Sequence, residues 1–198
     1  MRKSFGWSFI LALALAVAAL PVRAQDTKPA EEKAEQKAEA KPAPAGVRGE
    51  ILRQIEDAEK KLLALAEAIP AEKFGWRPGE GVRSTGEVFA HVAGGNFFLP
   101  TFWGAKVPEG VNPRNFEKEG SDKAKTIDTL KKSFAHVHQV IEAAPDSDLD
   151  RTVKFFGQEG SVRTVMMILA SHAHEHLGQS IAYARMNGVT PPWSAGGQ

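Results

Sequence analysis

Two histidines in one predicted helix carry the clearest chemical signal in the sequence. His172 and His176 are four residues apart, and side chains at this spacing lie one above the other on the same face of an α-helix. Two imidazole nitrogens placed in this way can converge on one transition-metal ion. Both histidines also continue the inward-facing stripe of that helix, which comprises Val165, Ile168, Gln179 and Tyr183.

His91 is the strongest candidate for a third ligand. It lies in another predicted helix beside Val88 and Val92, and Gly94 and Gly95 follow it about one turn later, where they would leave room next to a ligand. Three neutral histidines with open positions for water are typical of a catalytic metal site rather than a closed structural one. The alternative is a set of core histidines that are satisfied by hydrogen bonds and hold no metal.

The other histidines of the domain favour structural roles. His174 lies about 160° around the helix axis from His176 and is expected at the surface. His136 and His138 belong to a third helical segment, where surface or core-edge positions are expected. The chain has no cysteine, so thiolate ligands, disulfides and a cysteine nucleophile are excluded, and any metal must be held by His, Asp or Glu.

Two further side chains could support the histidines. Gln179 lies close to the direction of His172 and could orient a ligand ring by a hydrogen bond, and Glu175 is the second candidate for that role. Glu175 also completes the pattern His-x-x-Glu-His of inverzincin proteases, in which it would be the general base. Only 22 residues follow His176, too few for a further substrate-binding domain, so we favour a small-molecule site over a protease.

Four amphipathic segments would position these residues. Apolar side chains recur in them at steps of three and four, which predicts helices over residues 47–68, 84–103, 121–144 and 161–187. Four such helices in about 150 residues predict an all-α fold, a four-helix up-down bundle. Ser84 and Glu87 have the spacing of a capping box, which explains Glu87 as well as a catalytic role would.

Two connections between the predicted helices stand out. Residues 104–120 form a long crossover that contains Pro and Gly, and connections of this length are more often functional or mobile than idle. This crossover could shape the mouth of a pocket. Residues 152–156, followed by Gly157-Gln158-Glu159-Gly160, are compatible with a small β-hairpin before the last helix.

The first 24 residues have the pattern of a secretory signal peptide. Arg2 and Lys3 precede an apolar run over residues 7–20, and Val22-Arg23-Ala24 offers a small-x-small cleavage site. The run is shorter than the roughly 20 residues that span a bilayer, so cleavage is favoured over a retained anchor. We therefore expect an exported protein, periplasmic or secreted, with no membrane span after cleavage.

The next segment is predicted to be a linker. Residues 26–45 contain no large apolar side chain, and Glu and Lys each recur there at four-residue steps, which disfavours a helix. The expected organisation is a signal peptide over 1–24, a disordered Lys/Glu/Ala/Pro linker over 25–45 and a helical domain over 46–198. Cleavage would remove three of the 25 basic residues and none of the 24 acidic ones, leaving a net charge of −2. Such a charge gives no electrostatic case for nucleic-acid binding.

Three parts of the sequence resemble the DinB/YfiT-like family, which groups proteins described as metal-dependent enzymes. Residues 76–93 are similar to the family's entry into its second helix, with His91 at the place of its first metal histidine. His172-x-x-x-His176 followed by Gly178-Gln179 resembles the helix that carries its other two ligands, and residues 183–192 resemble its usual ending. The resemblance covers about residues 46–193.

This resemblance implies a bundle with a long crossover, one divalent transition metal (Zn, Ni or Fe) on three histidines, and often a homodimer. Glu175 and Leu177 stand where many members have a histidine and an arginine. Three functions remain open: a metal-dependent hydrolase or thiol transferase acting on a small molecule, a non-catalytic protein that binds a metal or a small ligand, and a structural bundle without metal.

Overall fold

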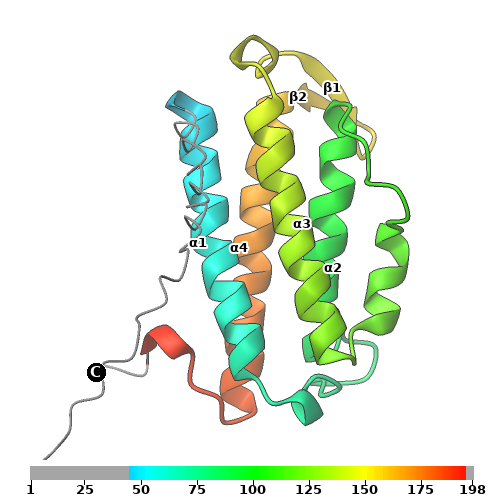
Figure 1. Ribbon diagram of the computed structural model, residues 1–198, viewed down its shortest axis with the longest axis vertical. Coiled ribbons are helices and arrows are strands. Elements are labelled where there is room, and N and C mark those ends of the chain that lie inside the picture. Colours follow the sequence, from blue (N-terminus) through cyan, green and yellow to red (C-terminus); the bar gives the residue numbers. More distant parts are fainter. Residues whose placement is uncertain (1–44, 195–198) are drawn as a thin grey trace, which may run out of the picture. The chain divides into compact units, whose positions relative to one another are not determined.

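The computed structural model describes residues 45–194, and these form a four-helix bundle (Figure 1). The helices are α1 (Gly46–Ala68), α2 (Thr85–Phe98), α3 (Lys123–Ala143) and α4 (Val162–Met186). All four predicted helices are thus confirmed, with ends shifted by one or two residues except at the end of α2. The predicted signal peptide and all of the predicted linker except Ala45 lie outside the described residues.

The chain direction departs from a simple up-down arrangement. Consecutive helices run antiparallel from α1 to α2 and from α3 to α4, but α2 and α3 run parallel (Figure 1). They can do so because the crossover between them is long enough to return to the starting end of α2, where Gly120 contacts Gly86. The bundle is therefore a four-helix fold in which a long crossover, rather than a tight turn, joins α2 to α3.

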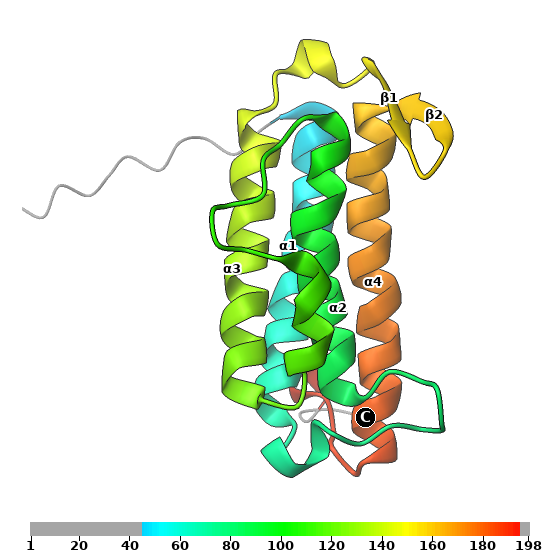
Figure 2. The same ribbon diagram turned by 90° about the vertical axis from the view of Figure 1, so that its right-hand side faces the viewer.

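The crossover is held against α2 by a contact between two glycines. Its last part forms a 3-10 helix, η3 (Pro113–Glu119), that lies along α2 in Figure 2. A Cβ atom on Gly86 would come within 1.7 Å of the carbonyl oxygen of Gly120. Neither position can carry a side chain without moving the backbone, so this contact fixes where η3 lies over α2.

The end of α2 differs from the sequence prediction, which extended the helix to Trp103. The α-helix stops at Phe98, and residues Leu99–Trp103 continue as a 3-10 helix, η2. Pro100 explains the change, because it has no N–H group to donate to the carbonyl one turn before it. Gly104, with a φ angle of +102°, then ends the segment.

The predicted hairpin is confirmed, and it packs at the start of α4. Strands β1 (Thr152–Phe155) and β2 (Gln158–Ser161) pair antiparallel, with Phe155 opposite Gln158. The two turn residues are Phe156 and Gly157, and both have positive φ angles, +48° and +78°. That backbone geometry is typical of the two-residue type I′ turns that suit the twist of a hairpin.

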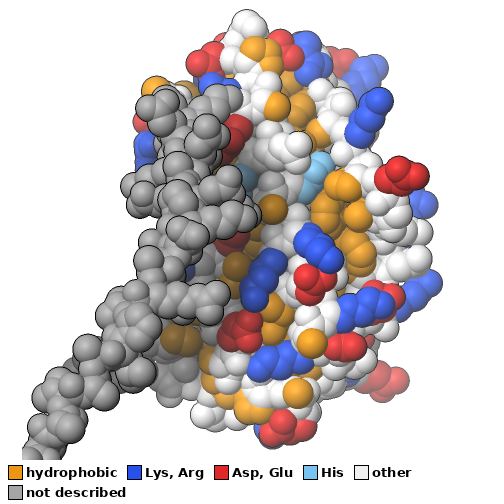
Figure 3. Space-filling view, viewed as in Figure 1, with side chains coloured by type: hydrophobic (Ala, Val, Ile, Leu, Met, Phe, Trp, Pro, Cys, Tyr) orange, Lys and Arg blue, Asp and Glu red, His pale blue; other side chains and the backbone are white. Residues whose placement is uncertain are grey.

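Apolar side chains from all four helices make up the core. Leu62, Phe89, Phe134 and Leu169 are among its fully buried members. The capping box predicted at the start of α2 is present, since Ser84 accepts from the Glu87 amide and Glu87 accepts from the Ser84 amide. Among the described residues, no helix is both long and apolar enough to cross a bilayer. On the face drawn in Figure 3, basic and acidic side chains are interspersed.

Candidate metal centre

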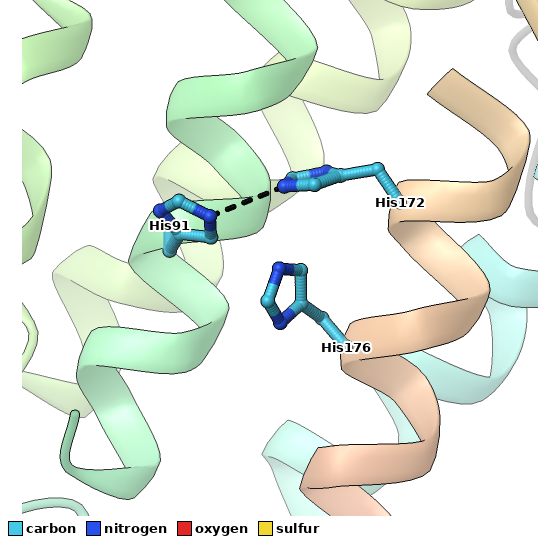
Figure 4. A group of neighbouring side chains, drawn as sticks. All are labelled: His91, His172 and His176. Atoms are coloured by element: carbon cyan, nitrogen blue, oxygen red, sulfur yellow. Dashed lines mark hydrogen bonds between the residues drawn. The ribbon is translucent and has the colours of Figure 1, made fainter. Parts of the chain in front are cut away.

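The three histidines singled out in the sequence converge in the structure. His91 extends from α2, and His172 and His176 extend from α4 toward it (Figure 4). One ring nitrogen of each histidine lies within 4.8 Å of one ring nitrogen of the others. The Nε2 atoms of His91 and His172 are 3.2 Å apart. Helix spacing brings the two α4 rings together, and the packing of α2 against α4 supplies the third.

Glu117 on the crossover orients the ring of His91. Its Oε1 lies 2.7 Å from His91 Nδ1, and its Oε2 accepts a hydrogen bond from Arg83 Nε at 3.0 Å. A carboxylate can only accept, so Nδ1 of His91 carries the proton, and its Nε2 presents a lone pair to the other histidines. A carboxylate behind a histidine is a recurrent arrangement in metal sites, where it fixes the ring and raises its basicity.

Gln179 holds the ring of His176 in the same way. Gln179 Oε1 lies 2.8 Å from His176 Nδ1, while its Nε2 donates to the hydroxyl oxygen of Tyr183 at 3.0 Å. The ring of Tyr183 packs edge-on against Trp76 at 5.4 Å between centroids. In this orientation the amide oxygen of Gln179 faces the histidine and its nitrogen faces Tyr183. The sequence placed Gln179 nearer to His172, but its partner is His176.

His172 lies in a space that Gly95 leaves open. A Cβ atom on Gly95 would come within 2.5 Å of His172 Cε1, so α2 approaches the ring closely only because residue 95 has no side chain. Nδ1 of His172 is buried and has no hydrogen-bond partner within the described range. Burial, together with smaller effects of the neighbouring His176 and His91, lowers the pKa of His172 to about 3. The ring is therefore neutral at physiological pH.

Burial also favours the neutral form of His91. It lowers the pKa of His91 and outweighs the hydrogen bond that His91 donates to Glu117, which acts in the opposite direction. For Glu117, burial raises the pKa, but the hydrogen bonds from Arg83 and His91 prevail and lower it. Glu117 is thus an ionised carboxylate that accepts from two donors. Its negative charge raises the pKa of His91, and the positive charge of Arg83 opposes that effect.

The residues present fit a transition-metal ion. Ring nitrogens of all three histidines face one another at short range, an arrangement that a shared cation would stabilise. Gly95 keeps the adjoining space free of a side chain, and two of the three rings are fixed from behind. Three nitrogen ligands suit Zn, Ni or Fe, and they leave coordination positions for a substrate.

Glu175 does not take the supporting position suggested for it. It is exposed, and within residues 45–194 it makes no hydrogen bond to the three histidines. Glu117 fills that role instead. Glu87 is engaged in the capping box and in an ion pair with Arg77 at 2.9 Å. Sequence patterns could not locate Glu117, because its position depends on how the crossover packs against α2.

The remaining histidines of the domain lie apart from this centre. His174 points to α1, where its Nε2 lies 3.0 Å from the Gln54 carbonyl oxygen. His138 pairs with Glu59. His136 is more buried than expected at 7% exposure, packed against Phe97. Helix α3 packs against both α1 and α2, so two faces of this helix are buried. His136 is covered for that reason.

Comparisons with known proteins support the fold. The profile of the DinB superfamily matches residues 54–180. A DinB-like protein from Bacillus cereus is 18% identical, with a TM-score of 0.60 over 72% of this chain and 93% of that one. The DinB-like protein YjoA from Bacillus subtilis is 19% identical, with a TM-score of 0.56 over 71% and 93% of the two chains.

YfiT from Bacillus subtilis, described as a probable metal-dependent hydrolase with an unusual four-helix bundle topology, is 12% identical. Its TM-score is 0.58 over 76% of this chain and 94% of that one. No curated protein sequence gave a match. The profile match spans more than half of the chain, and the solved structures share its bundle. The chain therefore belongs to the DinB superfamily.

Proposed function

We propose that this chain holds one divalent transition metal ion on His91, His172 and His176 and uses it in a hydrolysis or group transfer on a small molecule. The observation that carries the proposal is the convergence of three imidazole rings, two of which are held in place by hydrogen bonds to Glu117 and Gln179. The description of YfiT as a metal-dependent hydrolase favours the same class of reaction.

Such an ion would supply Lewis-acid chemistry at the open side of the centre. The protein's own residues prepare the site for it. Glu117 keeps the proton of His91 on Nδ1, and Gln179 fixes the ring of His176. The pocket described below leaves room for a substrate beside the centre.

The second candidate is a protein that binds a ligand at the metal without transforming it. One observation favours it, since the carboxylates of Glu117 and Glu87, the two candidates for a general base on this side of the bundle, are already engaged. Glu117 bonds to His91 and Arg83, and Glu87 bonds to Arg77 and its own helix cap. Neither is free to serve as a general base without giving up those partners.

Turnover by the metal-loaded protein tests between the two candidates. The protein is loaded in turn with Zn, Ni or Fe and assayed on small chromogenic esters, amides and phosphoesters, and on thiol transfer to small electrophiles. We expect turnover that chelation abolishes, that the same metal restores, and that His176→Ala lacks. One bound ion without metal-dependent turnover on any of these substrates would support the binding protein instead.

Export and self-association are further parts of the proposal. The signal-like pattern of residues 1–24 supports a periplasmic or secreted protein whose first residue is Gln25, which mass spectrometry of the native protein would reveal. Recovery of a soluble cytoplasmic protein with residues 1–24 intact would contradict export. The family resemblance supports a homodimer, which sedimentation of the purified domain tests.

A further inference from the structure

A pocket of about 450 Å³ opens directly beside the metal centre. It is lined by His91 and His172 together with residues of the crossover and the tip of the β-hairpin. Its apolar side chains are Phe98, Leu99, Pro113, Phe156 and Ile168. The volume is in the range of small-molecule sites, and such sites combine apolar walls with a few placed polar groups. A compound in this pocket would lie against the side of the centre formed by His91 and His172.

Phe156 is the most unusual residue of the pocket. Its φ angle of +48° is the only positive one among the described residues other than glycine, and a side chain with a Cβ atom is disfavoured in that conformation. Asparagine or glycine would suit the same turn better. The phenyl ring is nevertheless 63% exposed, so burial of the ring does not explain its presence. Unfavourable backbone conformations that persist in this way are concentrated at ligand sites.

The ring of Phe156 extends an aromatic wall. Its centroid lies 4.9 Å from that of Phe102 and 6.2 Å from that of Phe98, in tilted or edge-on arrangements. Phe98 is itself 40% exposed. Two partly exposed phenyl rings at the mouth of one pocket offer faces and edges on which another flat, apolar group can pack.

Arg114 provides a positive charge at the same pocket. It is exposed and lines the pocket, and it forms no ion pair with the residues that the structure describes. The carboxylate of the pocket, Glu117, is taken up by Arg83 and His91 and so does not compensate Arg114. A guanidinium without a partner beside apolar walls is suited to bind a carboxylate.

The geometry points to a ligand that joins one aromatic or similarly sized apolar group to a single carboxylate. The apolar group packs on Phe98 and Phe156, and the carboxylate pairs with Arg114. This assignment of a substrate class rests on the proposed function, but binding to the pocket does not need the metal. The two can therefore fail separately.

Calorimetry on the full mature protein, stripped of metal by a chelator, tests the assignment. Without a metal ion, a carboxylate cannot bind there through the centre. The probe is 4-phenylbutanoate, with 4-phenylbutanamide as the uncharged match and butanoate as the acid without a ring. We expect the aromatic acid to bind about two- to fivefold more tightly than its amide, in line with one exposed ion pair, and butanoate to bind most weakly.

Three variants locate the site. Phe156→Asn removes the ring while keeping a residue that favours the turn, and we expect it to weaken binding of the acid and the amide alike, by about tenfold. Arg114→Gln should leave amide binding unchanged and abolish the preference for the acid. Met167→Ala removes an apolar side chain on α4 that is 56% exposed and lies outside the pocket, and it should change neither.

Several results would overturn the assignment. These are equal binding of the acid and the amide to the unsubstituted protein, unchanged binding in Phe156→Asn, or an equal loss in Met167→Ala. Both pocket variants should also keep a full equivalent of metal when loaded. Loss of metal in Phe156→Asn would show that the ring serves the metal centre rather than a ligand. Failure of the metal site itself would leave the calorimetric result standing, because that measurement uses metal-free protein.

Discussion

Histidines lie at two different helix interfaces of this bundle, and their surroundings differ. Between α1 and α3, His138 Nε2 lies 2.7 Å from Glu59 Oε2, and the carboxylates of Glu56 and Glu142 act on it as well. The hydrogen bond to Glu59 raises the pKa of His138. Between α2 and α4, the ring nitrogens of His91 and His172 face each other, and burial lowers the pKa of both.

The contrast depends on what surrounds each carboxylate. Glu59 and its acidic neighbours stabilise the protonated form of His138, so the imidazolium itself is the cation at this interface. Glu117 also bonds to a histidine, but Arg83 shares it and reduces its effect on His91. The α2–α4 interface therefore favours the neutral forms of His91 and His172, and it brings ring nitrogens of all three histidines close together. The first arrangement is complete as it stands, whereas the second is suited to a cation from outside.

The largest effect that would sharpen this contrast is expected from Gly95→Ala. The added methyl group would come within 2.5 Å of His172 Cε1, which must move the ring or separate α2 from α4. We expect metal affinity, measured by chelator competition, to fall roughly 100-fold, the upper end for displaced ligand orientation.

The control for Gly95→Ala is Gly178→Ala on α4, where an added Cβ meets no atom within 4 Å. This variant should keep its metal and raise the free energy of unfolding by about 0.5–1 kcal/mol, because alanine is the better helix residue. If Gly95→Ala kept full affinity, the close fit between α2 and His172 would not matter for the site.

A smaller change in metal affinity is expected when the two carboxylates that bond to histidines, Glu117 and Glu59, are replaced in turn. Glu117→Gln weakens the hold on His91 and should lower metal affinity about tenfold. Glu59→Gln makes the same change at the other histidine–carboxylate pair and should leave metal affinity unchanged. Titration of both variants with Zn in the presence of a chromogenic chelator gives the two affinities. Equal losses would mean that Glu117 has no special relation to the centre.

The smallest effects concern how the free energy of unfolding depends on pH. The contributions of His172 and His138 to this dependence have opposite signs. His172 has a folded-state pKa of about 3, below its unfolded value of 6.5, so the unfolded state takes up its proton first. The free energy of unfolding of metal-free protein should fall as pH decreases below 6.5. For His138 the raised pKa stabilises the fold below pH 6.5, and this contribution is lost as pH rises through the raised value.

Urea unfolding of metal-free protein between pH 4.5 and 8.5 measures both slopes, each at most about 1.4 kcal/mol per pH unit for one group. His172→Gln should flatten the decline on the acidic side only. His138→Gln should remove a decline on the alkaline side only. A flatter acidic side in His138→Gln would show that the two interfaces are not distinguished by charge.

The local part of the site could be predicted from the sequence. His172 and His176 are on one helix, so their spacing alone determines that they share a face. The place of His91 beside an apolar stripe and before two glycines indicated the rest, and Gly95 does provide the space that was expected. These features depend on helix periodicity and on residue size, which a sequence displays directly.

The nonlocal part could not be predicted. Glu117 reaches His91 across 26 residues because Gly86 and Gly120 allow the crossover to pack on α2, and no periodicity reports such a contact. The parallel course of α2 and α3 follows from the same crossover. Phe156 looked like an ordinary strand residue, because its positive φ angle arises from the register of the hairpin. His136 is buried for a similar reason, the packing of α3 against two helices.

Metal content after removal of each histidine tests the central claim most directly. His91→Ala, His172→Ala and His176→Ala are compared with the unsubstituted protein for bound Zn, Ni and Fe by elemental analysis and for affinity by chelator competition. His174→Ala is the matched control, since His174 is on α4 but directed to α1. The account predicts one equivalent of metal in the unsubstituted protein and in His174→Ala, and loss of most of it in each of the other three. Full retention of metal after His91→Ala, or an equal loss in His174→Ala, would contradict a site built from His91, His172 and His176.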